Sequence, residues 1–460
     1  MMRYDVKSPN QILELSDTAM VQVKGLIPPG AQRGDQVDLI VTLPPRSEAS
    51  DLHGGWLLET RMRHQQRIGT SVHQSEILAI GTGAVITRDD TESSDDQALK
   101  TRGRILSGGY VQSDRSLGLV LRPAYAHVKL SARIAQAINE RFYFFDGTSR
   151  RGIAKAIEDD FIEIEVHPRY RDNVGRLMEV VRSIGIEPKI RDPQARLVDL
   201  GQRLADPATA AEAAIELEAI GESAVPTLLE GVESNNPELR FYAAEALAYL
   251  DRNESIEPLS EAATRVAAFR YPALTALQGL EQHLAAEALR DMTEESSLET
   301  RYGAFRAMRR RSDSRLHLSS LISGSSFGLY RVASQSKPAI VVSTRRDPEI
   351  VLFGSLNPLS LDSFLMGTAG IMVKHDPDHA GQIRLSRFES EKSDRFSLQP
   401  ATVRGLIDGV VAVGGGYSDV VAMLKRAKSK SVIVDPLAFD PIPKPMRTYY
   451  RDEVKSADTE

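Results

Sequence analysis

The chain has 460 residues, of which 42% are hydrophobic and 26% are charged, and this composition is typical of a folded globular protein with about three domains. The formal net charge of −6 argues against general nucleic-acid binding, which favours a basic domain. The absence of cysteine excludes disulfides, thiolate nucleophiles and cysteine-based zinc sites, and no stretch approaches the roughly 18 consecutive apolar residues of a membrane-spanning helix.

The first part of the chain has the pattern of an α+β region over residues 1–186. Apolar and polar residues alternate in several short runs between Thr18 and Pro123, and this period of two predicts half-buried strands. The period then becomes helical over 129–142, returns to that of a strand over 161–168, and is helical again over 170–186.

A glycine pair, Gly54-Gly55, directly precedes Trp56, the only tryptophan, in what otherwise has the pattern of a strand. Glycine pairs mark turns, bulges or positions where another backbone approaches closely. Three interpretations are open: a ligand contact, a packing arrangement in which the aromatic ring fills the gap beside the approaching backbone, or a contact with another chain. We expect packing rather than catalysis, with the second backbone supplied by the same subunit or by a neighbour.

An internal repeat begins near residue 206, where the composition shifts to alanine, leucine and glutamate. One apolar position recurs every 30 or 31 residues and is occupied by Leu217, Leu247, Leu277 and Met308. A second short helical run follows each of the first three, with Pro226 or Pro258 in its first turn in two cases. Helix pairs that recur at a fixed short period predict an α-solenoid of about four HEAT-like helix pairs, which we expect to fold separately from the flanking regions.

Strand-like runs return after Arg311, and two helices over 402–413 and 418–430 follow, separated by Gly414-Gly415-Gly416. The fold class predicted for the chain is therefore α+β, interrupted by the all-α solenoid. We expect the following segments: an α+β region over 1–186, a linker over 187–205, the solenoid over 206–311, a second α+β region over 312–434, and a proline-rich, charged tail over 435–460.

Little in the sequence indicates catalysis. The glycine-rich stretches 80–85 and 413–419 lack the spacing of a P-loop or a dinucleotide motif, so turns or helix ends explain them. His375, Asp376, Asp378 and His379 could ligate a metal. A polar turn around Pro377 between two strands explains the same residues, and we expect that turn. We therefore predict no enzyme activity and no cofactor.

A group of arginines lies at the end of the repeats. It indicates either a site for an acidic partner or a phosphate, or the solvated face of a solenoid end, and its members are Arg306, Arg309, Arg310, Arg311 and Arg315.

Several of these stretches, taken together and in order, resemble the bacterial flagellar P-ring protein family. The resemblance rests on a proline turn, a glycine-to-aspartate strand, the glycine pair, a G-R-I segment and a helix; the matching positions include Pro28, Pro29, Gly34, Asp38, Gly54, Gly55, Arg104 and Asn139. It covers residues 20–186 and, more loosely, 349–433, where the closing helix pair is similar. The solenoid has no counterpart in ordinary members of the family.

The resemblance implies a structural, non-enzymatic subunit that assembles with copies of itself into the periplasmic ring around the flagellar rod, with basal-body proteins as partners. The solenoid would bind a further, unidentified protein. No nucleic acid and no membrane span are expected. The family has a cleaved signal peptide, whereas residues 1–17 lack an apolar run, so we expect an in-frame upstream start that encodes one. The alternative is a HEAT-repeat adaptor of the cell envelope that retains a P-ring-like platform.

Overall fold

The computed structural model describes residues 17–45, 47–87, 97–145, 147–186, 193–313, 319–320, 327–367, 370–388, 393–445 and 447–451. The chain forms two compact units. The first combines Met1–Asp114 with Ser319–Asp440, and the second combines Arg115–Leu318 with Pro441–Glu460. Since the first unit is built from two separated pieces of chain, Arg115–Leu318 of the second unit is inserted into it, whereas Pro441–Glu460 follows it.

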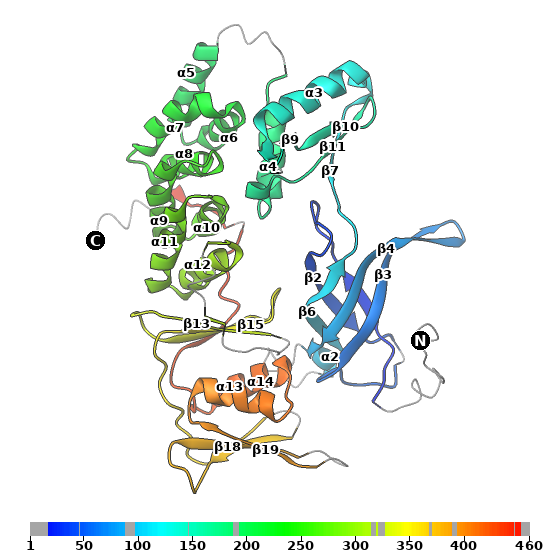
Figure 1. Cartoon of the computed structure of the whole chain (residues 1–460), viewed down its shortest axis with the longest axis vertical. Helices are drawn as coiled ribbons and strands as arrows, with labels where there is room; N and C mark the ends of the chain where they lie inside the picture. Colours follow the sequence, from blue (N-terminus) through cyan, green and yellow to red (C-terminus); the bar gives the residue numbers. More distant parts are fainter. Residues whose placement is uncertain are drawn as a thin grey trace. The chain divides into compact units, whose positions relative to one another are not determined.

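The N-terminal piece of the first unit is an antiparallel sheet with the strand order β1-β2-β6-β4-β3, and β5 also pairs with β6. Its elements are β1 (Gln22–Gly25), β2 (Gln36–Thr42), β3 (Trp56–Ile68), β4 (Ser71–Ala84), β5 (Ile86–Thr87), the short helix α2 (Gln97–Lys100) and β6 (Arg102–Val111). Alternate residues of β2 are buried, as the period of two predicted. The long β3–β4 hairpin reaches beyond the other strands of its sheet (Figure 1).

The C-terminal piece of the first unit contains two further sheets and a helix pair. A mixed sheet has the order β12-β13-β15-β14-β20, with β12 (Ser319–Ser320), β13 (Gly328–Val332), β14 (Ala339–Val342), β15 (Glu349–Phe353) and β20 (Leu437–Phe439). An antiparallel sheet has the order β16-β17-β18-β19, with β16 (Phe364–Met366), β17 (Ile371–His375), β18 (Gln382–Arg387) and β19 (Arg395–Pro400). The helices α13 (Val403–Ala412) and α14 (Tyr417–Ser429) share one apolar core with both sheets.

The second unit opens with a small α+β part. A three-stranded sheet, β10-β11-β7, and a two-stranded sheet, β8-β9, accompany two helices. The elements are β7 (Leu117–Val120), α3 (Val128–Arg141), β8 (Tyr143–Phe145), β9 (Arg150–Gly152), β10 (Ala154–Ala156), β11 (Phe161–Ile164) and α4 (Val174–Ser183), with single 3₁₀ turns at Pro123–Tyr125 and Pro168–Tyr170. The helical periods expected over 129–142 and 170–186 thus correspond to α3 and α4.

A run of helices follows, as the repeat predicted, and successive pairs stack on one another (Figure 1). The helices are α5 (Pro193–Leu204), α6 (Ala210–Ile220), α7 (Val225–Val232), α8 (Pro237–Tyr249), α9 (Ile256–Arg265), α10 (Arg270–Gly279), α11 (His283–Asp291) and α12 (Leu298–Arg310), with 3₁₀ turns at Glu222–Ala224, Asn253–Ser255 and Met292–Glu294. The four repeat residues Leu217, Leu247, Leu277 and Met308 are buried, one on each of α6, α8, α10 and α12. Within the described residues, α6 to α11 form three helix pairs, and α12 begins the fourth unit.

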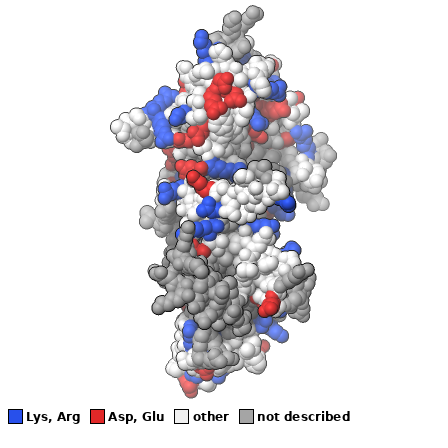
Figure 2. Space-filling model, turned by 90° about the vertical axis from the view of Figure 1, so that its right-hand side faces the viewer, with Lys and Arg blue, Asp and Glu red and all other residues white. Residues whose placement is uncertain are grey.

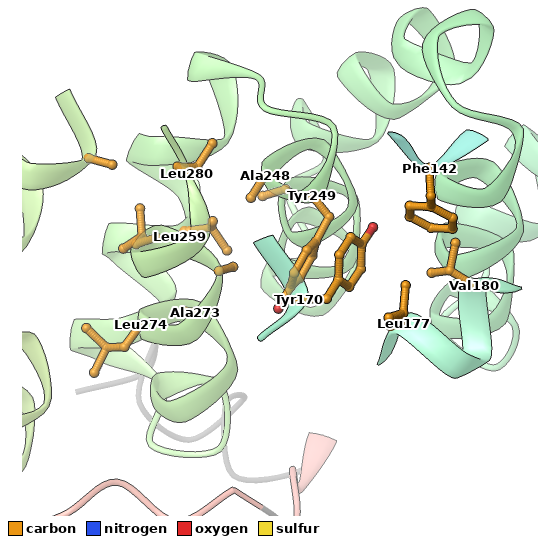
Figure 3. Close-up of a cluster of buried hydrophobic side chains, with 14 of the residues drawn as sticks. Phe142, Tyr170, Leu177, Val180, Ala248, Tyr249, Leu259, Ala273, Leu274 and Leu280 are labelled. Carbon is orange, nitrogen blue, oxygen red and sulfur yellow. The ribbon is translucent and has the colours of Figure 1, made fainter. Parts of the chain in front are cut away.

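The α+β part and the solenoid of the second unit share one hydrophobic core. Figure 3 shows Phe142, Leu177 and Val180 on one side of Tyr170, with the ring of Tyr249 from α8 on its other side. The rings of Tyr170 and Tyr249 stack with their centroids 4.5 Å apart. The solenoid is therefore not separated from residues 115–186, and the inserted unit begins at Arg115 rather than at the expected residue 206. Helix α5 also occupies most of the expected linker over 187–205.

A buried charge network crosses the same boundary. The Arg176 guanidinium on α4 donates to Glu218 on α6 through Nε at 2.9 Å and Nη2 at 2.6 Å. Its Nη1 lies 2.6 Å from a carboxylate oxygen of Glu245 on α8, and the Tyr170 hydroxyl donates to the second oxygen of Glu218 at 2.5 Å. One cation thus faces two carboxylates, all of them nearly inaccessible to water.

No helix among the described residues is long and apolar enough to cross a membrane.

We expect Arg176→Ala to lower the free energy of unfolding by about 3–5 kcal/mol, because it leaves the carboxylates of Glu218 and Glu245 buried without their cation. Denaturant unfolding followed by circular dichroism measures this. The matched control is Arg265→Ala, which breaks an exposed pair with Glu261 on α9 and should cost no more than about 0.5 kcal/mol. Equal costs for the two variants would contradict the buried network.

The buried network holds two carboxylates and only one cation, and this imbalance predicts that the stability of the fold depends on pH. Burial, opposed by Arg176 and assisted by Glu218, raises the pKa of the Glu245 carboxyl. A raised folded-state pKa means that the stability this group contributes is fully present below its unfolded pKa, about 4.3, and is lost as pH rises through the folded value. The neutral isostere in Glu245→Gln avoids that loss. We therefore expect its unfolding free energy, relative to the wild type, to be higher at pH 7 than at pH 4; the opposite trend would show that Glu245 stabilises the fold as an anion.

Candidate functional site

The two pieces of the first unit meet at a β-bulge around Asp38. The register of β2 against β6 shifts between Val37 and Leu39, so that three residues of β6 lie opposite Asp38. Ser107, at the middle of this bulge, has a positive φ of 51°. Its backbone N–H donates to Asp38 Oδ1 at 2.9 Å, and this bond fixes the unusual backbone conformation.

The second oxygen of Asp38 reaches the C-terminal piece of the unit. Asp38 Oδ2 accepts the backbone N–H of Arg346 at 2.7 Å, in the loop between β14 and β15. Arg346 also has a positive φ, 61°, and the Ser107 hydroxyl donates to the neighbouring Asp347 at 3.1 Å. The Asp38 carboxylate therefore accepts the backbone N–H groups of two non-glycine residues with a positive φ, one from each piece. We call this group, Asp38 with Ser107, Arg346 and Asp347, the Asp38 joint.

Apolar and charged contacts extend the joint. Ile86 of β5 and Leu106 of β6 are buried in the core of the C-terminal piece. The imidazole of His53 lies 3.6 Å from the Asp419 carboxylate, which accepts the Gly416 backbone N–H at the start of α14. The N-terminal sheet and the C-terminal helix pair are therefore held in one unit by side chains that are far apart in sequence.

The glycine pair before Trp56 forms a turn. The Gly55 N–H donates to the Leu52 carbonyl at 3.1 Å, and Gly54 between them has φ +67°. A Cβ on Gly55 would lie 2.9 Å from the same carbonyl oxygen, so a side chain there requires the turn to move. Trp56 itself is 60% exposed. Its ring does not fill an internal gap, so the packing within the subunit that we expected is supplied by the turn and not by the indole.

The other positions of the resemblance have local structural contacts. Pro28 accepts the Ala31 N–H in a turn that includes Pro29, and Gly34, with φ +90°, donates its N–H to Val111 at 2.8 Å. Arg104 is exposed on β6, opposite Ile40 of β2. The Asn139 side chain pairs with the backbone of Ala154, donating at 2.8 Å and accepting at 2.7 Å, and so holds α3 against β10.

The histidine–aspartate group occupies the turn between β17 and β18. Asp376 is buried; one of its oxygens lies 2.9 Å from His379 Nδ1, and the other accepts from Arg384 Nε at 2.8 Å. The His379 bond is the largest of the interactions that lower the pKa of the Asp376 carboxyl. His375 and Asp378 are exposed. Among the described residues no group of three or more histidine or acidic side chains is placed to hold a metal ion.

The arginine group at the end of the solenoid is not a uniformly solvated face. The Arg311 side chain is 4% exposed and pairs with Asp313. Its guanidinium donates to the Leu277 carbonyl in the last turn of α10 and to the Gln282 carbonyl after that helix, both at 3.0 Å. Arg310 pairs with Asp172 of the α+β part. Arg315 lies outside the described residues. On the face in Figure 2, Lys and Arg side chains are interspersed with Asp and Glu and form no continuous basic band.

The fold thus combines an α+β platform with an inserted unit that carries an α-solenoid. Residues 1–199 match the family model described as flagellar P-ring protein, and residues 196–278 match the model described as HEAT repeats. These matches confirm the resemblance inferred from the sequence: the first 199 residues are P-ring-like, and HEAT repeats follow them.

Curated relatives agree with the family model. The chain is 28% identical over 209 residues to the flagellar P-ring protein of Thermotoga maritima, which covers 43% of this chain and 56% of that protein. It is 32% identical over 196 residues to the flagellar P-ring protein of Paramagnetospirillum magneticum, which covers 40% of this chain and 44% of that protein. The chain spans about half the length of these curated relatives. The looser resemblance over 349–433 lies beyond the family match and stays a prediction.

We expect Asp38→Ala to lower the unfolding free energy of the first unit by about 1–3 kcal/mol, because two backbone N–H groups lose their acceptor. Hydrogen exchange at Ser107 and Arg346 should accelerate together, since one carboxylate holds both. The matched control is Asp362→Ala, an exposed aspartate of the same unit. Acceleration at Ser107 alone would show that Asp38 is a local bulge residue and not a joint.

The turn before β3 gives a second prediction. Gly55→Val should cost about 1–3 kcal/mol through the clash with the Leu52 carbonyl. Trp56→Ser should change the stability of the isolated subunit by no more than about 0.5 kcal/mol, because the indole is largely exposed. Thermal unfolding of both variants measures the difference, and the reverse order of stabilities would assign the packing role to the indole.

Proposed function

We propose that the protein is a structural subunit of a flagellar P ring, or of a divergent ring of the same kind, and that it acts without catalysis. The observation that carries the proposal is the match of residues 1–199 to the P-ring family. The resemblance implies a periplasmic position around the flagellar rod, with copies of the chain and basal-body proteins as partners.

The topology supports a ring platform to which the first unit contributes, and the P-ring match continues to residue 199, in the second unit. The Asp38 joint rebuilds one compact body from residues on both sides of the insertion, so the solenoid unit is added to the platform without interrupting its core. A closed ring requires two different, complementary surfaces on each subunit. The exposed Trp56 and the β3–β4 hairpin offer one such surface, and both lie in the segment that matches the family.

The second candidate is a HEAT-repeat adaptor of the cell envelope. It is favoured by the size of the inserted unit, because repeat solenoids present extended surfaces to partner proteins. In the ring proposal the solenoid binds a protein in addition to the ring contacts. In the adaptor proposal, the binding of a partner protein by the solenoid is the whole function, and the P-ring-like platform only carries the solenoid.

Imaging of purified basal bodies separates the two. We expect the tagged protein to co-purify with the rod, and the density of the ring to be lost in a deletion strain together with motility. Complementation with the wild type should restore both. Basal bodies with a complete ring, and normal swimming, in the deletion strain would contradict the ring proposal. A gene neighbourhood of rod and hook genes supports the ring, whereas its absence favours the adaptor.

A further inference from the structure

The C-terminal residues 441–445 and 447–451 lie along the solenoid, and we call them the strap; Met446 lies outside the described residues. The strap begins directly after Asp440, whose carboxylate accepts the Thr344 N–H at 2.7 Å in the first unit. Figure 1 shows the strap, in red, passing α12 and α10. It contacts the first helices of the repeat units at three points.

The first contact is with α12 and combines an apolar pair with an ion pair. Pro443 is buried against α12 at Gly303, where an added Cβ would lie 2.9 Å from the proline ring. Leu274 Cδ1 would lie closer still, at 2.6 Å, so the absence of a side chain on Gly303 makes room both for Leu274 and for the strap. Arg447, four residues further along the chain, lies 3.7 Å from the Glu299 carboxylate of the same helix.

The second contact is aromatic. The ring of Tyr449 stacks on Phe269, with centroids 4.6 Å apart and an interplanar angle of 28°. Phe269 in turn stacks on Phe241 of α8 at 4.2 Å and 7°. Tyr449 thus adds a third ring to a stack that two repeat units of the solenoid already form.

The third contact is a charge pair. Arg451 donates to both oxygens of Glu238 on α8, at 2.8 and 3.0 Å, and to the Pro207 carbonyl at 2.7 Å. The Glu238 side chain is 5% exposed, whereas that of Arg451 is 56% exposed. The accepting carboxylate of Glu238 is therefore buried, and the donating side chain of Arg451 reaches it from the solvent-exposed side. We call Glu238, Phe241, Phe269, Glu299 and Gly303 the acceptor face.

The strap is held by separated side chains. Lys444, Pro445, Thr448 and Tyr450 between the contacts are exposed, and the described strap residues belong to no sheet. Prolines at 441, 443 and 445 favour an extended, semi-rigid chain between Asp440 and the acceptor face. A segment of this kind can leave its acceptor face without unfolding either unit.

We propose that the acceptor face of one copy binds the strap of a second copy, so that straps exchange between neighbouring subunits. Exchange preserves every contact, because each copy carries the same strap and the same acceptor face. The two surfaces are different and complementary, which is the head-to-tail relation that a ring needs. This inference rests on the proposed ring and names one of its subunit contacts.

In an isolated subunit, the strap binds the acceptor face of its own chain. A tethered strap has an effective concentration in the millimolar range, so the intramolecular form dominates in dilute solution. Exchange becomes competitive when copies are crowded, as they are at an assembling ring. The proposal therefore predicts that the subunit is monomeric in dilute solution and exchanges straps where the local concentration of copies is high.

The absence of cysteine from the chain permits a direct test. One full-length protein carries Tyr450→Cys, in an exposed strap position next to Arg451, and a second carries Ala208→Cys, next to Pro207. A double variant with both cysteines reports the contact within one chain. Each single-cysteine protein alone gives the background of symmetric dimers, and tags of different mass identify the mixed dimer.

We expect a short bis-maleimide crosslinker to join the two cysteines of the double variant within one chain in dilute solution, since the Arg451 guanidinium bonds to Pro207. The mixed single variants should form a mixed dimer whose yield rises with concentration and falls about tenfold when Arg451→Ala is added to the strap protein or Glu238→Gln to the acceptor protein. Thr448→Ala, an exposed strap position between the contacts, should leave the yield unchanged. A complete internal crosslink, with a mixed-dimer yield no higher than that of the Arg451→Ala control, would overturn strap exchange.

Failure of the internal crosslink would also overturn the proposal, because the strap would then not occupy the acceptor face. The assay uses purified protein and needs no flagellum. Strap exchange can therefore fail while the protein is still found in basal bodies, and it can succeed while the protein is absent from them.

Discussion

The second unit depends on the burial of Arg176 between two carboxylates. A guanidinium can be removed from water only where several acceptors replace its hydration, and Glu218 and Glu245 supply them from α6 and α8. Because Arg176 itself belongs to α4, this requirement fixes the α+β part onto the solenoid. The stacked rings of Tyr170 and Tyr249 exclude water from the same boundary. Charge pairing and aromatic packing thus make one core of segments with different folds.

The helices and strands could largely be predicted from the sequence, because their signals are local. The repeat position held by Leu217, Leu247, Leu277 and Met308 is a period in the chain, and all four residues are buried. The division into units could not be predicted, because it depends on pairs such as Tyr170 with Tyr249 that have no periodic pattern. The expected boundary at residue 206 followed the change in composition, whereas the core continues across it.

The same distinction applies to the candidate site. Asp38 was identified through a resemblance, and its role depends on Ser107 and Arg346, which are 69 and 308 positions away. Neither partner is a glycine, so nothing in the sequence marks their left-handed backbones. Trp56 shows the converse, since its sequence context indicated packing but its side chain is exposed. Exposure is decided by what covers a residue, and a single strand pattern does not contain that information.

An insertion is tolerated where the chain leaves and re-enters a body that is held together by other contacts. Here Asp114 and Ser319 are the last and first residues of the two pieces of the first unit, and the Asp38 joint connects those pieces without the inserted chain. The second unit could therefore acquire its own core and its own surface. After Asp440 the chain returns to the second unit, where Arg451 donates to the buried carboxylate of Glu238. The contacts that join the two pieces of the first unit and the contacts that hold the strap on the solenoid share no residue, so a substitution in one group is expected to leave the other in place.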